Sequence, residues 1–158
     1  MAFPSAREYA LRLLAIRPRT VRELRDKLAR RGHAPGAVAA LLADLSAIGL
    51  LDDARFAKMW IEGRAALKPM GQARLRAELS AKGVDRGLVD EALAGLRDEL
   101  DEPAAALKLA QRKARAWRDL APEARERRIS GFLGRRGYSG GVISATLKKL
   151  RKGFTDDG

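Results

Sequence analysis

Apolar and polar positions of this 158-residue chain recur in the same order three times. The pattern consists of two apolar residues at helical spacing, a basic residue followed by glycine, and three more apolar residues. The three copies are Leu24, Leu28, Arg31, Gly32, Val38, Leu42 and Leu45; Leu75, Leu79, Lys82, Gly83, Val89, Leu93 and Leu96; and Ile129, Leu133, Arg136, Gly137, Ile143, Leu147 and Leu150. Such recurrence indicates a chain built from repeated supersecondary units.

A second pattern precedes each copy and also has helical spacing. Its members are Tyr9, Leu13 and Arg17; Phe56, Trp60 and Arg64; and Ala105, Leu109 and Lys113. The third copy departs from the others because Ala105 stands at the aromatic position. Apolar residues three and four apart share one face of a helix, so each repeat is predicted to hold three helices.

Local signals set the predicted helix ends. In the first repeat Pro18 ends the first helix, and Thr20 with Glu23 forms the capping box of the second. Gly32 ends that second helix, since glycine accepts the positive φ that follows a helix. The predicted helices are Ser5–Ile16, Thr20 to Gly32, Pro35–Ala47, Asp52–Leu67, Gln72–Ala81, Asp85–Leu100, Asp101–Trp117, Glu123–Arg136 and Ser139–Lys152.

The segment from Gly49 to Asp53 joins the first two repeats. Gly49 fits the end of one helix, and Leu50 and Leu51 supply the apolar contact that accompanies such an end. Asp52 and Asp53 are predicted to cap the next helix. The alternative, a metal or acid–base site at the paired aspartates, has no partner ligand nearby and would predict metal-dependent stability.

These patterns predict an all-α protein of three tandem three-helix repeats that form an elongated, curved array. The expected boundaries are 1–51, 52–100 and 101–153, followed by a frayed tail at 154–158. Each repeat has a narrow apolar stripe, so its core must be completed by neighbouring repeats.

Composition excludes several classes of site. The chain has no cysteine and one histidine, His33, which removes disulfides, thiolate metal sites and imidazole pairs. Charged residues interrupt the start of the chain, and no run approaches the ~20 apolar residues of a membrane span. We therefore expect a cytoplasmic protein without membrane association.

The net charge of +12 favours a polyanionic partner. The first predicted repeat carries a net charge of +5, the second 0 and the remainder +7. The alternative is a coding bias that places arginine on any solvated face. Charge therefore indicates a class of partner and no mechanism.

Residues suited to catalysis are scarce. The chain lacks the Gly-Lys-Ser/Thr sequence of a Walker phosphate loop. His33 follows a helix-ending glycine, where the other repeats have Val84 and Tyr138, so we interpret it as a packing residue. We expect no enzymatic activity, no metal and no cofactor.

Basic residues on the second helices of the first and third repeats form two candidate ridges for phosphate contacts without base readout. The alternatives are a solvated helix face and simple complementation of helix dipoles. Trp60 is expected in the core, whereas Trp117 fits either base stacking or burial. The candidate binding residues are Arg22, Arg25, Arg30, Arg31, Arg64, Arg74, Lys82, Arg127, Arg128, Arg135 and Arg136.

Several of these segments together resemble the bacterial RecX family. They are Ala10-Leu11-Arg12-Leu13-Leu14, Thr20-Val21-Arg22-Glu23-Leu24, Arg31-Gly32-His33, Gly49-Leu50-Leu51-Asp52-Asp53, Arg55-Phe56-Ala57 and Lys82-Gly83. The resemblance is dense from about residue 6 to 95 and continues more loosely to about 150. Ala105, at the aromatic position of the third repeat, is the chief departure from the family pattern.

The resemblance implies a regulator, mainly an inhibitor, of the RecA recombinase. Such proteins lie in the groove of the RecA filament on single-stranded DNA, suppress its ATPase and strand exchange, and limit the SOS response in recombination and repair. The implied partners are this nucleoprotein filament and single- and double-stranded DNA, with the chain a monomer. The middle repeat is expected to meet RecA, and the basic repeats to contact DNA phosphate or acidic RecA surface.

The rival hypothesis is a stand-alone helical DNA-binding protein that acts through phosphate contacts. Its helix-turn-helix-like pair would span Thr20 to Ala47. A recognition helix needs base-reading side chains at its start, and the segment Ala34-Pro35-Gly36-Ala37-Val38 offers none.

Overall fold

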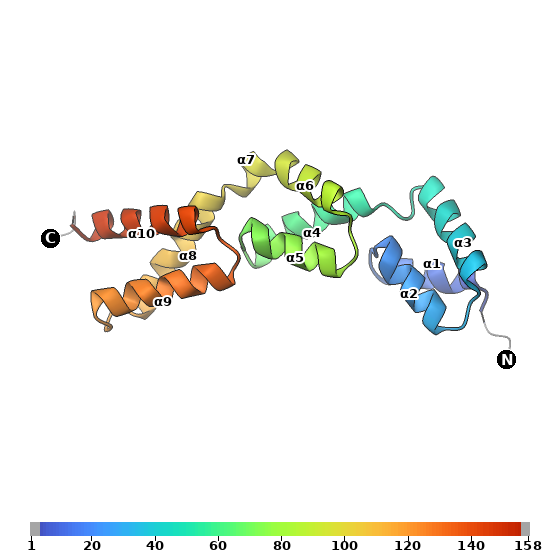
Figure 1. The fold of residues 1–158 in the computed structure, drawn as a ribbon, viewed down its shortest axis with the longest axis horizontal. Coiled ribbons are helices and arrows are strands. Elements are labelled where there is room, and N and C mark those ends of the chain that lie inside the picture. Colours follow the sequence, from blue (N-terminus) through green and yellow to red (C-terminus); the bar gives the residue numbers. More distant parts are fainter. Residues whose placement is uncertain (1–3, 156–158) are drawn as a thin grey trace. The chain divides into compact units, whose positions relative to one another are not determined.

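The structure is a computed structural model that describes residues 4–155, and every regular element in that range is a helix (Figure 1). The helices are α1 (Ala6–Ile16), α2 (Val21–Arg30), α3 (Pro35–Ala47), α4 (Asp53–Leu67), α5 (Gln72–Ala81), α6 (Arg86–Gly95), α7 (Arg97–Leu100), α8 (Glu102–Ala116), α9 (Pro122–Arg135) and α10 (Gly140–Thr155). The predicted all-α class and the succession of three-helix repeats are confirmed.

Two predicted helix bounds need correction. The single helix expected over Asp85–Leu100 is interrupted at Leu96, which separates α6 from α7. Gly95 is a weak helix former, and the side chain of Leu96 is buried. Helix α10 extends to Thr155, past the predicted start of a tail, and the last three residues of that predicted tail lie outside the described residues.

The helices form two compact units. One comprises the residues up to Trp60 together with Glu78–Ala92, and the other comprises Ile61–Ala77 together with the residues from Leu93 onward. Both units take residues from the second repeat, so the predicted repeat boundaries stay predictions. The elongated, curved array stays a prediction as well.

The caps of the first repeat follow the sequence signals. The Thr20 hydroxyl accepts the Glu23 N–H at 3.1 Å, and the Glu23 carboxylate accepts the Thr20 N–H at 3.3 Å, which completes the predicted capping box. Gly32 and Gly49 have φ of 86° and 79° after the ends of α2 and α3. Ser5 and Glu8 form a further capping box at α1. Helix ends in this repeat are thus fixed by local chemistry.

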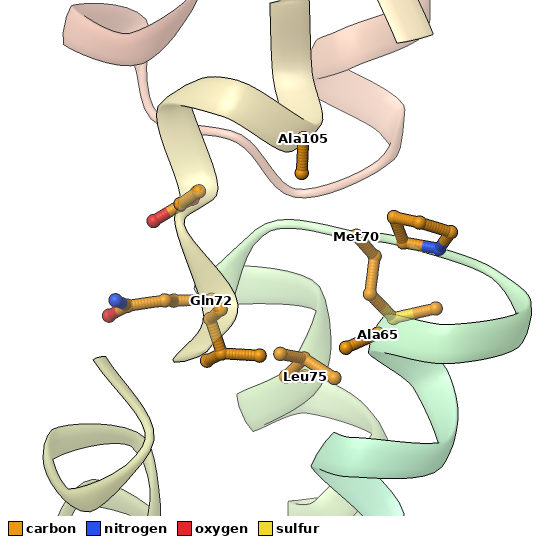
Figure 2. Close-up of a pocket in the computed structure, with 8 residues that line it drawn as sticks. Ala65, Met70, Gln72, Leu75 and Ala105 are labelled. Atoms are coloured by element: carbon orange, nitrogen blue, oxygen red, sulfur yellow. The ribbon is translucent and has the colours of Figure 1, made fainter. Parts of the chain in front are cut away.

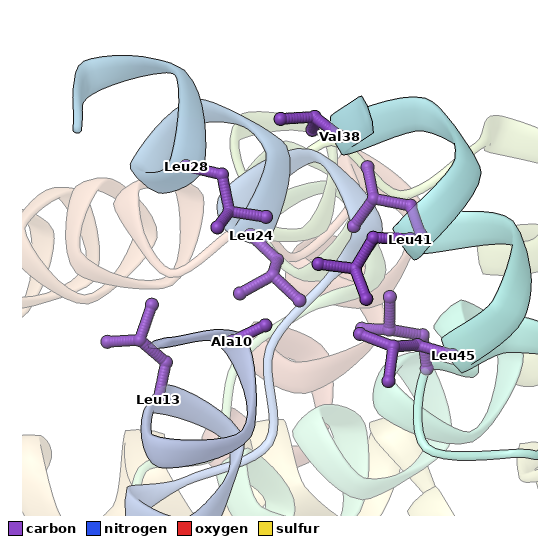
Figure 3. Packing of buried hydrophobic residues seen from close by; sticks show 9 residues of the cluster. Ala10, Leu13, Leu24, Leu28, Val38, Leu41 and Leu45 are labelled. Atoms are coloured by element: carbon purple, nitrogen blue, oxygen red, sulfur yellow. The ribbon is translucent and has the colours of Figure 1, made fainter. Parts of the chain in front are cut away.

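The first repeat has a core built from its own residues within the first compact unit, which corrects the expectation that neighbouring repeats must complete it. Leu24, Leu28 and Leu45 are fully buried, and side chains of α1, α2 and α3 point toward one another there (Figure 3). Complete burial of one leucine contributes about 1.5 to 3 kcal/mol. The apolar positions of the first copy of the repeat pattern therefore define this core, as predicted.

The third repeat has a corresponding core within the second compact unit, where α8, α9 and α10 pack on one another. Ile129 and Leu133 of α9 are buried, and three buried alanines four residues apart face them from α8. Those alanines are Ala106, Ala110 and Ala114. Small side chains allow α8 to approach its neighbours closely, and larger residues such as Ile129, Leu133 and Tyr138 fill the rest of this core.

The start of α2 meets the end of α5, and we call this contact the first joint. The Thr20 hydroxyl donates a hydrogen bond of 2.6 Å to the carbonyl of Lys82. The Arg22 guanidinium donates to the carbonyl of Ala81. Carbonyls in the last turn of a helix have no partner within that helix, so the start of α2 satisfies groups that α5 leaves open.

Asp53 belongs to the first joint and corrects the prediction that both aspartates cap α4. Asp52 does so by accepting the Arg55 N–H at 3.0 Å, whereas the Asp53 carboxylate accepts the Val21 N–H at the start of α2, also at 3.0 Å. Burial raises the pKa of Asp53, the bond from Val21 opposes this, and nearby Asp52 and Glu23 raise the pKa further. Asp53 therefore connects two repeats.

An ion-pair network surrounds the first joint. Glu23 lies 3.2 Å from Arg17 and 3.2 Å from Lys82. The Lys82 ammonium lies 4.4 Å from the centre of the Trp60 ring, whose indole N–H donates to Glu78 at 3.0 Å. Burial alone would raise the pKa of Glu23, but hydrogen bonds from Arg17 and Lys82 bring it below its usual value. Glu23 thus stabilises the joint in its ionised form.

The second joint repeats this arrangement between the start of α5 and the end of α9. The Gly71 N–H donates to the carbonyl of Arg136 at 2.7 Å. The Arg136 guanidinium in turn donates a hydrogen bond of 3.0 Å to the carbonyl of Pro69. In the sequence repeat Gly71 corresponds to Thr20 and Arg136 to Lys82. A backbone N–H therefore does in the second joint what a hydroxyl does in the first.

Gly71 is buried, and a methyl group on it would overlap the backbone of Gly137. We expect Gly71→Ala to lower the free energy of unfolding by about 1 to 3 kcal/mol, because the joint would have to separate. Gly63→Ala in the middle of α4 is the matched control. Nothing lies within 4 Å of its added methyl, so it should stabilise the protein by up to about 1 kcal/mol. Urea denaturation measures both, and equal effects would contradict the close approach.

We expect Glu23→Gln to lower the free energy of unfolding at pH 7 by about 1 kcal/mol, because hydrogen bonds to two cations lose their charge. The folded pKa of Glu23 is depressed, so its contribution is present above the ordinary value of 4.5 and is lost as the pH falls through the folded pKa.

The difference between the wild type and this variant should therefore shrink as the pH is lowered below 4.5. Urea denaturation at a series of pH values tests this. Glu99→Gln, an exposed substitution on α7, should change the free energy by less than about 0.5 kcal/mol throughout. A difference for Glu23→Gln that is independent of pH would refute the network.

Candidate binding surface

Several basic side chains predicted as a ridge on α2 are held by the protein itself. The Arg30 guanidinium donates to the carbonyl of Asp26 at 3.2 Å, and Arg25 lies 3.5 Å from the carboxylate of Asp26. Arg31 stacks over the ring of Tyr9, with 4.3 Å between the guanidinium carbon and the ring centre. Exposed contacts of this kind are weak, so a partner can displace them.

A second group of predicted residues lies at or near the joints. Arg22, Lys82 and Arg136 each bind a backbone carbonyl or a carboxylate of a neighbouring repeat, as described above. Arg74 lies beside Gly137, where an added methyl would overlap it, and Arg64 is half-buried near the end of α4. The structure therefore gives much of this group a role in holding repeats together.

The remaining predicted residues, Arg127, Arg128 and Arg135, gather on α9. They line an open hollow together with Leu120, Ala124 and Gly131. The three arginines are exposed, and none of them makes an ion pair with another residue in the range 4–155. Arg127 and Arg128 each lie three or four residues from Ala124 and Gly131, and Arg135 lies four residues from Gly131. Residues three and four apart share one side of a helix, so this arginine hollow is a single continuous surface.

Glu126 precedes Arg127 on α9, but its carboxylate is paired with a residue of α10. The Arg151 guanidinium donates two hydrogen bonds of 2.6 Å to the two oxygens of the Glu126 carboxylate. The hydrogen bonds from Arg151 lower the pKa of Glu126. Sequence analysis missed this pair, because residues 25 apart carry no local signal of contact. Because Glu126 is bound to Arg151, its negative charge is not available to pair with the neighbouring arginines of α9.

Trp117 packs against the core of the third repeat and is half-buried. Two cations lie over its ring: the Lys113 ammonium at 5.3 Å and the Arg128 guanidinium at 5.4 Å from the ring centre. Of the two interpretations left open, packing is the one the contacts favour. The ring also helps to hold Arg128 at the arginine hollow. Trp60, which was expected in the core, is half-buried and stacks on Phe56 with 5.9 Å between the ring centres.

Among residues 4–155, no group of three or more His, Cys, Asp or Glu side chains is placed to hold a metal ion. Asp52 and Asp53 bind the starts of two different helices, and His33 is half-buried beside a helix end. Within the same range no helix has the length and apolar character to cross a membrane. The arrangement suits binding of an anionic surface.

Comparison with known domains finds three matches in succession along the chain. Residues 6–45 match the domain described as RecX, first three-helix domain. Residues 52–93 match the second three-helix domain of RecX, and residues 101–147 match the third. The three matches follow one another in order and cover most of the chain.

Relatives that align with most of this chain agree with the domain matches. The chain is 37% identical over 153 residues to regulatory protein RecX of Streptomyces lividans, which covers 97% of this chain and 79% of the relative. It is 42% identical over 135 residues to regulatory protein RecX of Mycobacterium avium, which covers 85% and 78%.

Solved structures share the fold. The crystal structure of RecX from Lactobacillus salivarius superposes with a TM-score of 0.85 at 22% identity, covering 92% of this chain and 94% of that one. A second crystal structure of regulatory protein RecX gives a TM-score of 0.81 at 24% identity, covering 90% and 70%. The domain matches and the sequence relatives together establish that this chain belongs to the RecX family.

Proposed function

We propose that this chain regulates the RecA recombinase by binding in the groove of the RecA filament on single-stranded DNA. Binding there would suppress the ATPase and strand exchange of RecA and so limit recombination, repair and the SOS response. The support is membership of a family whose relatives are named regulatory proteins. In this proposal the chain acts as a cytoplasmic monomer, without a cofactor and without catalysis of its own.

The arginine hollow on α9 is the observation that carries the proposal. Guanidinium groups present planar forks that match phosphate and carboxylate oxygens. Arg127, Arg128 and Arg135 are exposed, unpaired with described acids and held on one rigid helix. We therefore assign the main anionic contact to the third repeat, with DNA phosphate as its target and acidic RecA surface as the alternative.

In this proposal the basic residues of the first repeat contribute less to binding than those of the third. Arg25 and Arg30 are exposed and engaged only by weak contacts with Asp26, so they can add contacts to a bound filament. Arg22 and Lys82 hold the first joint, and removing them would separate repeats before it tested binding. The middle repeat, which carries no net charge, is proposed to meet RecA itself.

We expect the wild-type protein to inhibit DNA-dependent ATP hydrolysis by RecA at ratios well below one per RecA protomer. Arg127→Glu, Arg128→Glu and Arg135→Glu in one chain should raise the concentration needed for half-inhibition by at least about tenfold, because three contacts become repulsive. Salt titration of the binding should also give a shallower slope if the lost contacts are phosphates.

The control variant carries Arg7→Glu, Arg12→Glu and Arg97→Glu, three exposed residues of α1 and α7 that give the same change of net charge. It should inhibit nearly as well as the wild type. Equal loss in both variants would show that net charge alone matters, and no loss in either would exclude the arginine hollow. Salt-sensitive binding of naked DNA without any effect on RecA would favour a stand-alone DNA-binding protein.

A further inference from the structure

Basic side chains on α8 form a second cationic surface of the third repeat. Lys108, Arg112 and Arg115 are all exposed, and we call them the α8 ridge. Their separations of four and three residues place them on one side of the helix. None of the three forms an ion pair or a side-chain hydrogen bond with another residue in the range 4–155. The α8 ridge therefore presents three positive charges that no described residue pairs with.

Acidic residues are scarce around the α8 ridge. The acid within α8 is Glu102, which lies in the first turn, six residues before Lys108. Helix α10, which packs on α8, contains no acidic residue between Gly140 and Thr155. The first acid that follows the ridge along the chain is Asp119, which lies 4.0 Å from Arg118. The positive potential of the ridge is therefore weakened by few charges of its own repeat.

The α8 ridge faces away from the core of the third repeat. Ala110 is fully buried in that core and lies two residues from both Lys108 and Arg112. Residues two apart point about 200° apart around a helix, so the two cations lie on the opposite side of α8. The start of α8 has another neighbour, since Ala105 and Met70 both line a small hollow there (Figure 2). The ridge begins three residues beyond Ala105, on the exposed side of the helix.

The arginine hollow of α9 lies on a different side of the repeat from the α8 ridge. Arg127 and Arg135 of the hollow are two residues from Ile129 and Leu133, which are buried in the core that α9 shares with α8. The same helical geometry turns these arginines away from that core. Both helices thus carry their cations on their outer sides, with the core between them. An anionic segment that runs along one surface leaves the other surface free.

The α8 ridge is a property of the third repeat and not of the shared fold. At the corresponding positions the second repeat has Met59, Gly63 and Ala66, which are exposed as well. These residues carry no charge, and yet α4 is a regular helix of the same length as α8. The helix therefore does not need cations at these positions. A coding bias towards arginine would also have charged the exposed positions of the second repeat.

The ligand that fits this surface is a phosphate backbone. Phosphate contacts need cations and no apolar anchor, whereas protein interfaces are centred on buried aromatic or aliphatic anchors. The exposed large apolar side chains among the described residues lie between Leu11 and Leu67, outside the third repeat. From Lys108 to Arg115 the helix rises about 10 Å, which matches about three phosphates of one DNA strand at a rise of about 3.4 Å each. The three cations can therefore meet successive phosphates.

We propose that the α8 ridge binds the phosphate backbone of a second nucleic-acid segment while the arginine hollow holds a first. One chain then joins two segments of DNA through different sides of its third repeat. Neither contact reads a base, so this joining does not depend on sequence. The inference rests on one part of the proposed function, the contact of the arginine hollow with DNA, and goes beyond it because it does not require RecA.

A DNA capture experiment with the full chain tests the proposal. Beads carry a biotinylated single-stranded oligonucleotide, and a fluorescent single strand of non-complementary sequence is added with the protein in low-salt buffer. We expect the wild type to hold the fluorescent strand on the beads. Lys108→Glu, Arg112→Glu and Arg115→Glu in one chain, the ridge variant, should lower this retention by at least about tenfold, because one of the two surfaces becomes repulsive.

The ridge variant should still bind the fluorescent strand alone, as measured by fluorescence anisotropy, because the arginine hollow is unchanged. The variant of the arginine hollow described under the proposed function should also lose retention on the beads. The matched control carries Arg7→Glu, Arg12→Glu and Arg97→Glu and should retain the strand as the wild type does. All three variants undergo the same change of net charge, so net charge alone cannot produce this difference.

Retention by the ridge variant at the wild-type level would overturn the proposal, and so would an equal loss in the control or no retention by the wild type. A ridge variant that captures DNA normally but no longer inhibits RecA would assign the ridge to an acidic protein surface instead. Capture by the wild type without any effect on RecA would support the inference and remove RecA from the proposed function. If circular dichroism shows the ridge variant to be unfolded, Lys108→Gln, Arg112→Gln and Arg115→Gln replaces it with the same expected loss of retention.

Discussion

The unsatisfied carbonyls at the end of a second helix are the constraint on which the described contacts between repeats depend. A helix leaves its last four C=O groups without internal partners, and burying them unpaired costs free energy. At the end of α5 the start of α2 provides a hydroxyl and a guanidinium, and at the end of α9 the start of α5 provides a backbone N–H. A repeat thus completes the neighbour that follows it.

This constraint divides the basic residues into two sets. Arg22, Lys82 and Arg136 belong to the joints. Their side chains bind carbonyls or a carboxylate there, or lie over an aromatic ring. Arg127 and Arg135 make no such contact among residues 4–155, and Arg128 lies only over the ring of Trp117. Glu126, the acid among the arginines of α9, is bound by Arg151. The large net charge therefore overstates the surface available to a partner, and the third repeat carries a greater share of it.

The repeats share one arrangement of helices but differ in the side chains that pack between those helices. In the first joint, Asp53 and Glu23 supply the acids, and the ring of Trp60 lies against Lys82. The third repeat instead packs α8 through closely spaced alanines, and the opposite side of that helix carries the α8 ridge. In a repeat protein, an exposed position at which the copies differ is where binding can be added without changing the fold.

The sequence by itself determined the helices, their caps and their buried faces, because the capping box of Thr20, the positive φ of Gly32 and the spacing of Leu24 and Leu28 act within a few residues. It also singled out candidate basic residues, but it did not separate those held in the joints from those exposed on α9. Only the tertiary structure decided that Asp53 binds α2, that Glu126 pairs with Arg151, and which arginines stay open to a partner. Those outcomes depend on contacts between residues more than twenty positions apart, and a local pattern carries no information about such distances.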